Sequence, residues 1–101
     1  MEILYEEPGN GFIGISWNES LDNWEMHIEC NSWSHTKFKR YLQGLEKAKA
    51  TLRERGIERV FGICASKKER KFNIVFGAKE VPGGIVLTED GILNYLTVLE
   101  I

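Results

Sequence analysis

Apolar side chains recur every three or four residues in the middle of the chain, the spacing that places them on one face of an α-helix. These apolar positions are Phe38, Tyr41, Leu42, Leu45, Ala48 and Leu52. Ser34 or Thr36 can cap the start of the helix by accepting a backbone hydrogen bond. Gly56 can adopt the left-handed conformation that ends it, with Ile57 packing back onto Leu52. The pattern therefore predicts one long amphipathic helix.

Two further segments follow that helix. Residues 60–65 form a nearly unbroken apolar run, which is typical of a strand buried on both faces in a sheet with helices on either side. Residues 67–76 predict a short helix capped by Ser66. Its inward-facing side chains are expected to be Phe72, Val75 and Phe76. A helix, a buried strand and a second helix indicate a layered α/β arrangement.

The first third of the chain reads as strands. Residues 1–5 and 12–17 are apolar segments separated by a turn composition, and residues 24–30 alternate between apolar and polar side chains. One face of this last strand would carry Trp24, Met26, Ile28 and Cys30, and the other Glu25, His27 and Glu29. Because carboxylates flank His27, this polar face could relay a proton. The alternative is a face that is solvated or paired across the sheet.

The last quarter of the chain predicts more strand. Residues 79–81 lead into a bend at 82–84, and residues 85–88 and 92–101 predict a hairpin around an Asp-Gly turn at 89–91. The sequence thus predicts a single domain over residues 1–101. Its fold class is α/β (α+β), with a mixed, mostly antiparallel sheet, a long central helix and a second short helix. The predicted order is β-β-β-α-β-α-β-β.

Composition adds few constraints. The chain is 43% hydrophobic and 28% charged, which is ordinary for a soluble domain. No apolar run approaches the roughly 20 residues that span a bilayer, and no signal-peptide pattern opens the chain, so we expect a cytoplasmic protein with no membrane contact. Cys30 and Cys64 lack CxxC spacing and are expected to be reduced, buried thiols. With His27 and His35 they form no ligand spacing, so no metal is expected.

The charge is unevenly distributed. Residues 37–71 hold 12 of the 13 lysines and arginines but only four acids, a net of +8, whereas the rest of the chain carries −10 and the whole −2. Such a basic segment could attract the phosphates of a nucleic acid. The alternative is a set of solvated helix faces balanced by acidic strands. Because aromatic residues interleave poorly with these charges, nucleic acid is not the expected partner.

The central stretch resembles a known family. The helix ending in Arg55-Gly56-Ile57, the apolar strand after it, and Ser66 followed by residues 72–78 are similar to the C-terminal half of the GNAT superfamily of acyl-CoA-dependent N-acyltransferases. That family shows a helix ending in Arg-Gly-Ile, a buried strand and then Asn-x-x-Ala-x-x-Phe-Tyr-x-x-x-Gly-Phe. The resemblance is close over residues 45–78 and loose over the rest. Small proteins of this kind encoded by tailed phages are a fainter similarity.

The resemblance implies a site for acetyl-CoA or another acyl-CoA between the strand ending at Cys30 and the strand ending at Ala65. It implies that the general base is Glu25, His27 or Glu29. The residues implied to contact the cofactor are Cys30, Asn31, Lys37, Lys39, Arg40, Ser66 and Asn73. Asn73 stands where the family often has the tyrosine that protonates the leaving thiolate, and a carboxamide cannot act as a general acid near neutral pH.

The chain also departs from the family at the loop that holds pyrophosphate. The family pattern Gln/Arg-x-x-Gly-x-Gly/Ala, which lets backbone N–H groups approach the phosphates, matches Thr36, Lys39 and Tyr41 here. We therefore expect a GNAT-like fold with a degenerate acyl-CoA site that serves as a non-catalytic binding or assembly module. Its partner would be a second copy or another protein, contacted through the tryptophans and exposed strand edges.

Two alternatives stay open from the sequence. One is a divergent acyl-CoA-dependent N-acyltransferase, and the other is nucleic-acid binding through residues 37–71. The loop between Cys30 and Phe38 distinguishes the binding module from the acyltransferase. Free N–H groups converging on a cleft would favour a cofactor, and a loop packed shut by Trp33 would favour a binding role.

Overall fold

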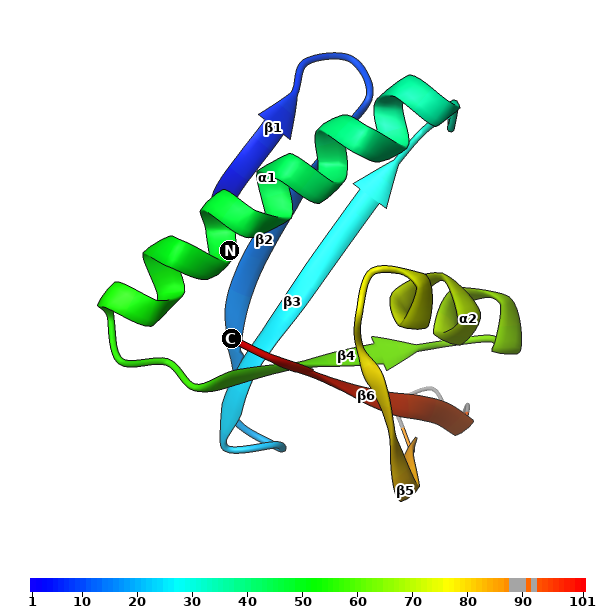
Figure 1. Cartoon of the computed structure of the whole chain (residues 1–101). Coiled ribbons are helices and arrows are strands. Elements are labelled where there is room, and N and C mark those ends of the chain that lie inside the picture. Colours follow the sequence, from blue (N-terminus) through cyan, green and yellow to red (C-terminus); the bar gives the residue numbers. More distant parts are fainter. Residues whose placement is uncertain (88–90, 92) are drawn as a thin grey trace.

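The computed structural model describes the chain except residues 88–90 and 92, and it shows an α+β fold with two helices and a mixed six-stranded sheet (Figure 1). The elements are β1 (Glu2–Glu7), β2 (Gly11–Asn18), β3 (Asn23–Cys30), α1 (His35–Glu54), β4 (Arg59–Cys64), α2 (Lys67–Val75), β5 (Lys79–Leu87) and β6 (Leu93–Glu100). This is the predicted order of strands and helices. The sheet order is β1-β2-β3-β4-β6-β5. Strands β3 and β4 are parallel, and the other neighbours are antiparallel.

Local sequence signals set both ends of α1. The Ser34 hydroxyl accepts a hydrogen bond from the backbone N–H of Lys37 at the start of the helix. At the other end Gly56 has φ of 77°, and the N–H of Ile57 donates to the carbonyl of Leu52 at 3.0 Å. This is the pattern of a Schellman motif, which satisfies the last carbonyls of a helix. The predicted start and end of α1 are confirmed.

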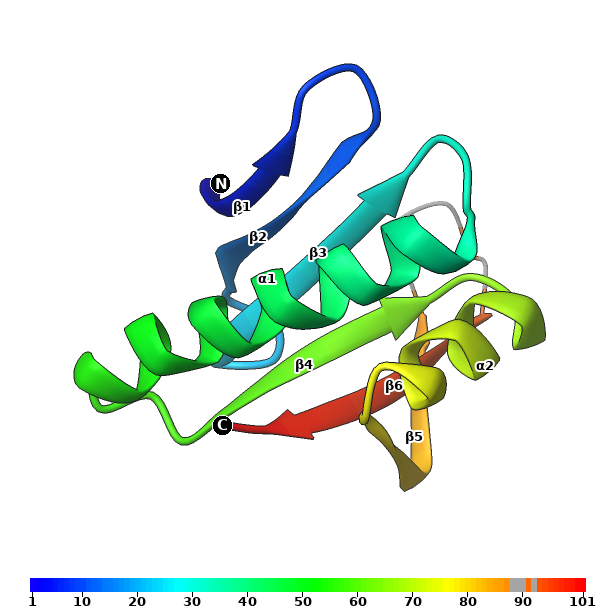
Figure 2. The ribbon, with the colours of Figure 1, turned by 45° about the horizontal axis from the view of Figure 1, so that its top comes forward.

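Both helices lie on the same face of the sheet (Figures 1 and 2). One core joins side chains of α1 and the end of α2 to the strands beneath them: Ile13, Ile15, Tyr41, Leu45, Ala48, Leu52, Val60, Phe76 and Leu99. The predicted placement of helices on either side of the sheet is therefore wrong. The connections from β3 to β4 and from β4 to β5 both run in the same direction across the sheet. Two right-handed crossovers in one direction put both helices on one face.

The single covered face also corrects the prediction for β4. Val60, Gly62 and Cys64 are buried beneath the helices, whereas Phe61 and Ile63 on the opposite face are only half-buried. Although the run is apolar throughout, its burial alternates, so it is not a strand buried on both faces. The prediction that Val75 faces inward is also wrong, because its side chain is 58% exposed. The α2 face that meets the sheet carries Phe72 and Phe76 instead.

Strand β5 is one strand with an irregular middle. Its pairing with β6 shifts register between Glu80 and Ile85, where Gly83 has φ of 69°. The predicted bend at 82–84 is therefore an irregularity within β5. The predicted turn at 89–91 lies largely outside the described residues. Within the part of the chain that the structure describes, no helix is long and apolar enough to cross a membrane.

Candidate functional site

The two parallel strands at the centre of the sheet separate and leave a cleft. Strands β3 and β4 share one paired position, Glu25 with Phe61, and they diverge toward their carboxyl ends (Figures 1 and 2). The cleft has a volume of about 230 Å³. Its lining residues come from β3, β4 and α2: Glu25, Met26, His27, Ile28, Glu29, Ile63, Cys64, Glu69, Phe72 and Asn73. Three of these are carboxylates, so the cleft suits a neutral or cationic group rather than a phosphate.

The structure brings four of the predicted site residues together in this cleft. Glu25, His27 and Glu29, the predicted general-base candidates, line it from β3, and Asn73 lines it from α2. His27 is already engaged, because its Nε2 lies 2.8 Å from the Ser16 hydroxyl oxygen. The other predicted residues lie elsewhere. Ser66 caps α2 by accepting from the N–H of Glu69, and the remaining five lie around the start of α1.

A hydrogen-bond network fixes the loop at the start of α1, and Asn10 is at its centre. The Asn10 amide nitrogen donates to Cys30 Sγ at 3.1 Å and to the Tyr41 hydroxyl at 3.4 Å. Its amide oxygen accepts from the Ser32 N–H at 3.3 Å and from Lys37 Nζ at 3.3 Å. The turn between β1 and β2 thus holds the loop that leads from β3 into α1.

The predicted phosphate-binding residues are committed to this network or to neighbouring groups. The N–H of Asn31 donates to the Asn10 carbonyl at 2.7 Å, and Lys37 Nζ donates to the Ser32 hydroxyl at 2.6 Å. Arg40 forms an ion pair with Glu7 at 2.6 Å between Nε and Oε1. Lys39 is exposed on α1. The backbone N–H of Asn31 and the side-chain cations of Lys37 and Arg40 therefore already have partners within the chain, whereas the Lys39 side chain is exposed.

Trp33 fills the space between the two helices. Its ring centroid lies 5.1 Å from Tyr41, 5.0 Å from Phe72 and 5.7 Å from Phe76. Phe38 of α1 also contacts Phe76, with centroids 5.2 Å apart. We call these five rings the aromatic plug. Edge-on and tilted pairs at such distances are favourable beyond the area they bury, so these contacts tie the loop after β3 to both helices, while Trp33 stays 41% exposed.

Tyr41 joins the plug to the Asn10 network. Its ring is fully buried, and its hydroxyl donates to the Glu29 carbonyl at 3.1 Å. Burial, followed by the neighbouring Cys30 sulfur, raises the pKa of Tyr41 to about 12. The phenol is therefore neutral at physiological pH and acts as a structural donor. It is not a source of protons for chemistry in the cleft.

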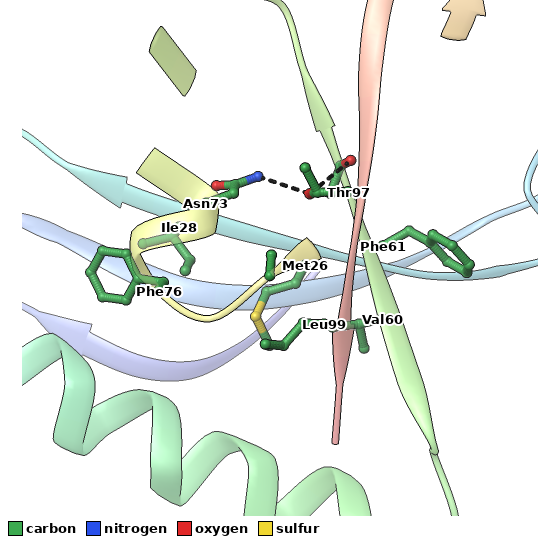
Figure 3. A pocket seen from close by; sticks show the side chains of 10 residues that line it. Met26, Ile28, Val60, Phe61, Asn73, Phe76, Thr97 and Leu99 are labelled. Atoms are coloured by element: carbon green, nitrogen blue, oxygen red, sulfur yellow. Dashed lines mark hydrogen bonds between the residues drawn. The ribbon is translucent and has the colours of Figure 1, made fainter. Parts of the chain in front are cut away.

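A second polar network lies beneath α2 (Figure 3). Asn73 donates to Cys64 Sγ at 3.0 Å and to the Thr97 hydroxyl at 3.3 Å, and Thr97 donates to the Gly62 carbonyl at 3.4 Å. A Cβ on Gly62 would lie 2.7 Å from the Asn73 amide nitrogen and 2.8 Å from the Thr97 hydroxyl oxygen, so a larger residue there would have to displace the groups of this network. The adjoining cavity of about 30 Å³ has room for little more than a water molecule. Burial raises the pKa of the Cys64 thiol.

Sequence reasoning missed three of the residues that organise these sites: Asn10, Ser16 and Thr97. Asn10 lies in a Gly-Asn-Gly turn and carries no periodic signal. Ser16 could have been found, because the hairpin prediction places it opposite β3 on the polar face. Thr97 occupies an apolar-looking strand, and its partners come from distant segments.

Within the described part of the chain, no group of three or more histidine, cysteine, aspartate or glutamate side chains could hold a metal ion. Comparison of the chain with protein-family models, with curated proteins and with solved structures found no match.

Proposed function

We propose that the chain is a binding or assembly module with a GNAT-like fold whose acyl-CoA site has been closed. The observation that carries the proposal is the position of Trp33, which contacts Tyr41 of α1 and Phe72 of α2. In the family that the sequence resembles, the cofactor lies between the strands that match β3 and β4, with its pyrophosphate at the start of the long helix. Trp33 packs the loop between β3 and α1 against rings of both helices, so a cofactor that reached across this loop would have to displace these rings.

The start of α1 supports the same proposal. A pyrophosphate needs free N–H groups and close backbone approach. Here the Ser34 hydroxyl accepts from the N–H of Lys37, and the Asn10 side chain accepts from the N–H of Ser32. Lys37, the nearest cation, is bonded to Ser32 and Asn10. A phosphate would have to break several of these bonds to bind.

The uncovered face of the sheet is the surface that we assign to a protein partner. Phe61 of β4 pairs with Val98 of β6, and Ile63 pairs with Leu96. All four are half-buried on the face opposite the helices. A sheet face with paired apolar side chains can pack against another sheet at about 10 Å. A second copy of the chain would supply such a face, and closed two-fold dimers are the commonest assembly.

Isothermal titration with acetyl-CoA and with free CoA tests the closed site. We expect no heat at high micromolar ligand, and saturable binding would contradict the proposal. Light scattering tests the assembly role. We expect a dimer that Ile63→Lys separates into monomers, with Lys39→Ala as the control on the helix side. A monomer that binds acetyl-CoA would overturn the proposal.

A divergent N-acyltransferase is the second candidate, and the cleft between β3 and β4 favours it. Glu25, His27 and Glu29 line that cleft, and a carboxylate or imidazole there could take the proton of an attacking amine. The test is release of CoA thiol from acetyl-CoA in the presence of a primary amine. Wild-type activity that Glu29→Gln reduces would favour the enzyme. If neither the wild type nor Glu29→Gln released CoA thiol, the enzyme would be contradicted and the binding module would stand.

A further inference from the structure

A serine, a histidine and a glutamate lie next to one another in an array on the uncovered face of the sheet. His27 Nε2 lies 2.8 Å from the Ser16 hydroxyl oxygen, and His27 Nδ1 lies 3.7 Å from Glu25 Oε2. The Asn18 amide nitrogen donates to the other Glu25 oxygen at 3.0 Å. The array runs between β2 and β3, on the opposite face from the aromatic plug.

The register of the hairpin produces this arrangement. Ser16 stands directly opposite Glu25, and Gly14 stands directly opposite His27. Because Gly14 has no side chain, the imidazole can lean diagonally across the pair toward Ser16, within the reach of diagonal neighbours in an antiparallel sheet. The His27 side chain remains 33% exposed and that of Glu25 17% exposed, so a small reagent can reach the array.

The order of the three groups defines their possible roles. A carboxylate next to Nδ1 favours the imidazole tautomer that carries its proton on that nitrogen. Nε2 is then the acceptor, and it lies at hydrogen-bond distance from the Ser16 hydroxyl. Asn18 holds the carboxylate in place. A nucleophile, a base within reach and a group that orients the base are the parts of an activated serine.

We propose that Ser16 is a reactive nucleophile that accepts acyl groups from small activated esters, with His27 as its base and Glu25 as a positioning residue. Ser16 Oγ attacks the ester carbonyl carbon, and its proton passes to His27 Nε2. The carbonyl–oxygen bond to the leaving alcohol breaks, and that alcohol or the solvent takes the proton from His27. The products are acyl-Ser16 and the free alcohol. No redox partner or metal is needed.

The expected reaction is slow single acylation rather than rapid turnover. A positioned base contributes about 10² to 10⁴ in rate, which distinguishes Ser16 from an ordinary surface serine. We assign no oxyanion donors to the array, and each such donor is worth about 10² to 10³ in kcat. Acyl-Ser16 should therefore form slowly and persist long enough for mass spectrometry.

The test is acetylation of the full chain by p-nitrophenyl acetate, followed by peptide mass spectrometry that assigns each acetyl group to a residue. The internal control is Ser20, an exposed serine outside the array. We expect Ser16 to be acetylated about 100-fold faster than Ser20. We expect His27→Gln to abolish most of that difference while the circular dichroism spectrum stays that of the wild type.

Two results would overturn the proposal. One is a Ser16 rate no greater than that of Ser20, and the other is a fast Ser16 rate that His27→Gln leaves unchanged. Ser16→Ala serves as the second variant, and it should remove the Ser16 adduct without changing acetylation of the lysines. The readout is an acetyl group on Ser16 formed from an ester without CoA, so a failure of this experiment is distinguishable from a failure of the acyl-CoA titration even though His27 and Glu25 also line the cleft between β3 and β4.

Discussion

The space between the two helices and the space between β3 and β4 differ, because side chains fill the first and the second is an open cleft. The gap between α1 and α2 is filled by Trp33 and four other rings, whereas the gap between β3 and β4 remains a cleft of about 230 Å³. Helix surfaces can be joined by apolar side chains alone. Diverging strands expose backbone N–H and C=O groups that need polar partners. The space between the helices is therefore occupied by the side chain of one loop residue, Trp33, whereas the cleft between the strands stays open.

Among substitutions in the loop and turn that close the helix side, Trp33→Ala should have the largest effect, because it empties the filled gap. Buried tryptophan-to-alanine changes cost about 3 to 5 kcal/mol, and Trp33 is 41% exposed, so we expect a loss of about 2 kcal/mol in urea denaturation. Trp17→Ala is the matched control. Trp17 is 49% exposed and contacts mainly Trp24 at 5.4 Å. If Trp17→Ala lost as much free energy of unfolding as Trp33→Ala or more, the packing role assigned to Trp33 would be contradicted.

Asn10→Ala should have the second largest effect, because it removes the bonds that hold the closed loop. Each net hydrogen bond contributes about 0.5 to 1.5 kcal/mol, so we expect a loss of about 1.5 kcal/mol. Amide hydrogen exchange at Ser32 and Trp33 should accelerate, while exchange in β6 should follow only the global change. Unchanged exchange in the loop would show that Asn10 does not hold it.

Tyr41→Phe should change how stability depends on pH. The folded pKa of Tyr41 is about 12, above its ordinary value near 10, so the fold favours the protonated phenol. This stability is fully present below pH 10 and is lost as pH rises toward 12. Urea unfolding between pH 9 and 11.5 should therefore show a steeper decline for the wild type than for Tyr41→Phe. Parallel curves would contradict a buried neutral phenol.

Val75→Lys should have the smallest effect, because its side chain lies outside both gaps. Exposed substitutions usually change stability by less than about 0.5 kcal/mol. Phe76→Ala is the comparison, because Phe76 is buried in the plug and should lose about 3 kcal/mol. Similar losses of unfolding free energy for the two variants would mean that α2 turns a different face toward the sheet.

The sequence predicted the elements well because their signals are local. Ser34 and Gly56 mark the ends of α1 through their own backbone chemistry, and the order of strands and helices followed from periodicity. The side of the sheet that each helix covers could not be read from an apolar run. It depends on the direction of two successive crossovers, and β4 is half-exposed for that reason.

The site residues also divide into those that a local pattern predicts and those that depend on contacts between distant segments. Alternation along β3 placed Glu25, His27 and Glu29 on one face, and the structure keeps them together at the cleft. The closure of the helix gap depends on where a single Trp33 side chain packs between rings of α1 and rings at α2, which is distant in the sequence. No spacing along the chain encodes that. Asn10 was missed because the partners that it holds in the loop and in α1 lie 20 or more positions away.

The most direct test of the closed site is a nuclear Overhauser spectrum of the Trp33 indole ring, recorded without and with millimolar acetyl-CoA. A packed plug predicts cross-peaks from Trp33 to Tyr41, Phe72 and Phe76, unchanged by the ligand. Absence of these cross-peaks, or their loss when acetyl-CoA is added, would contradict the account.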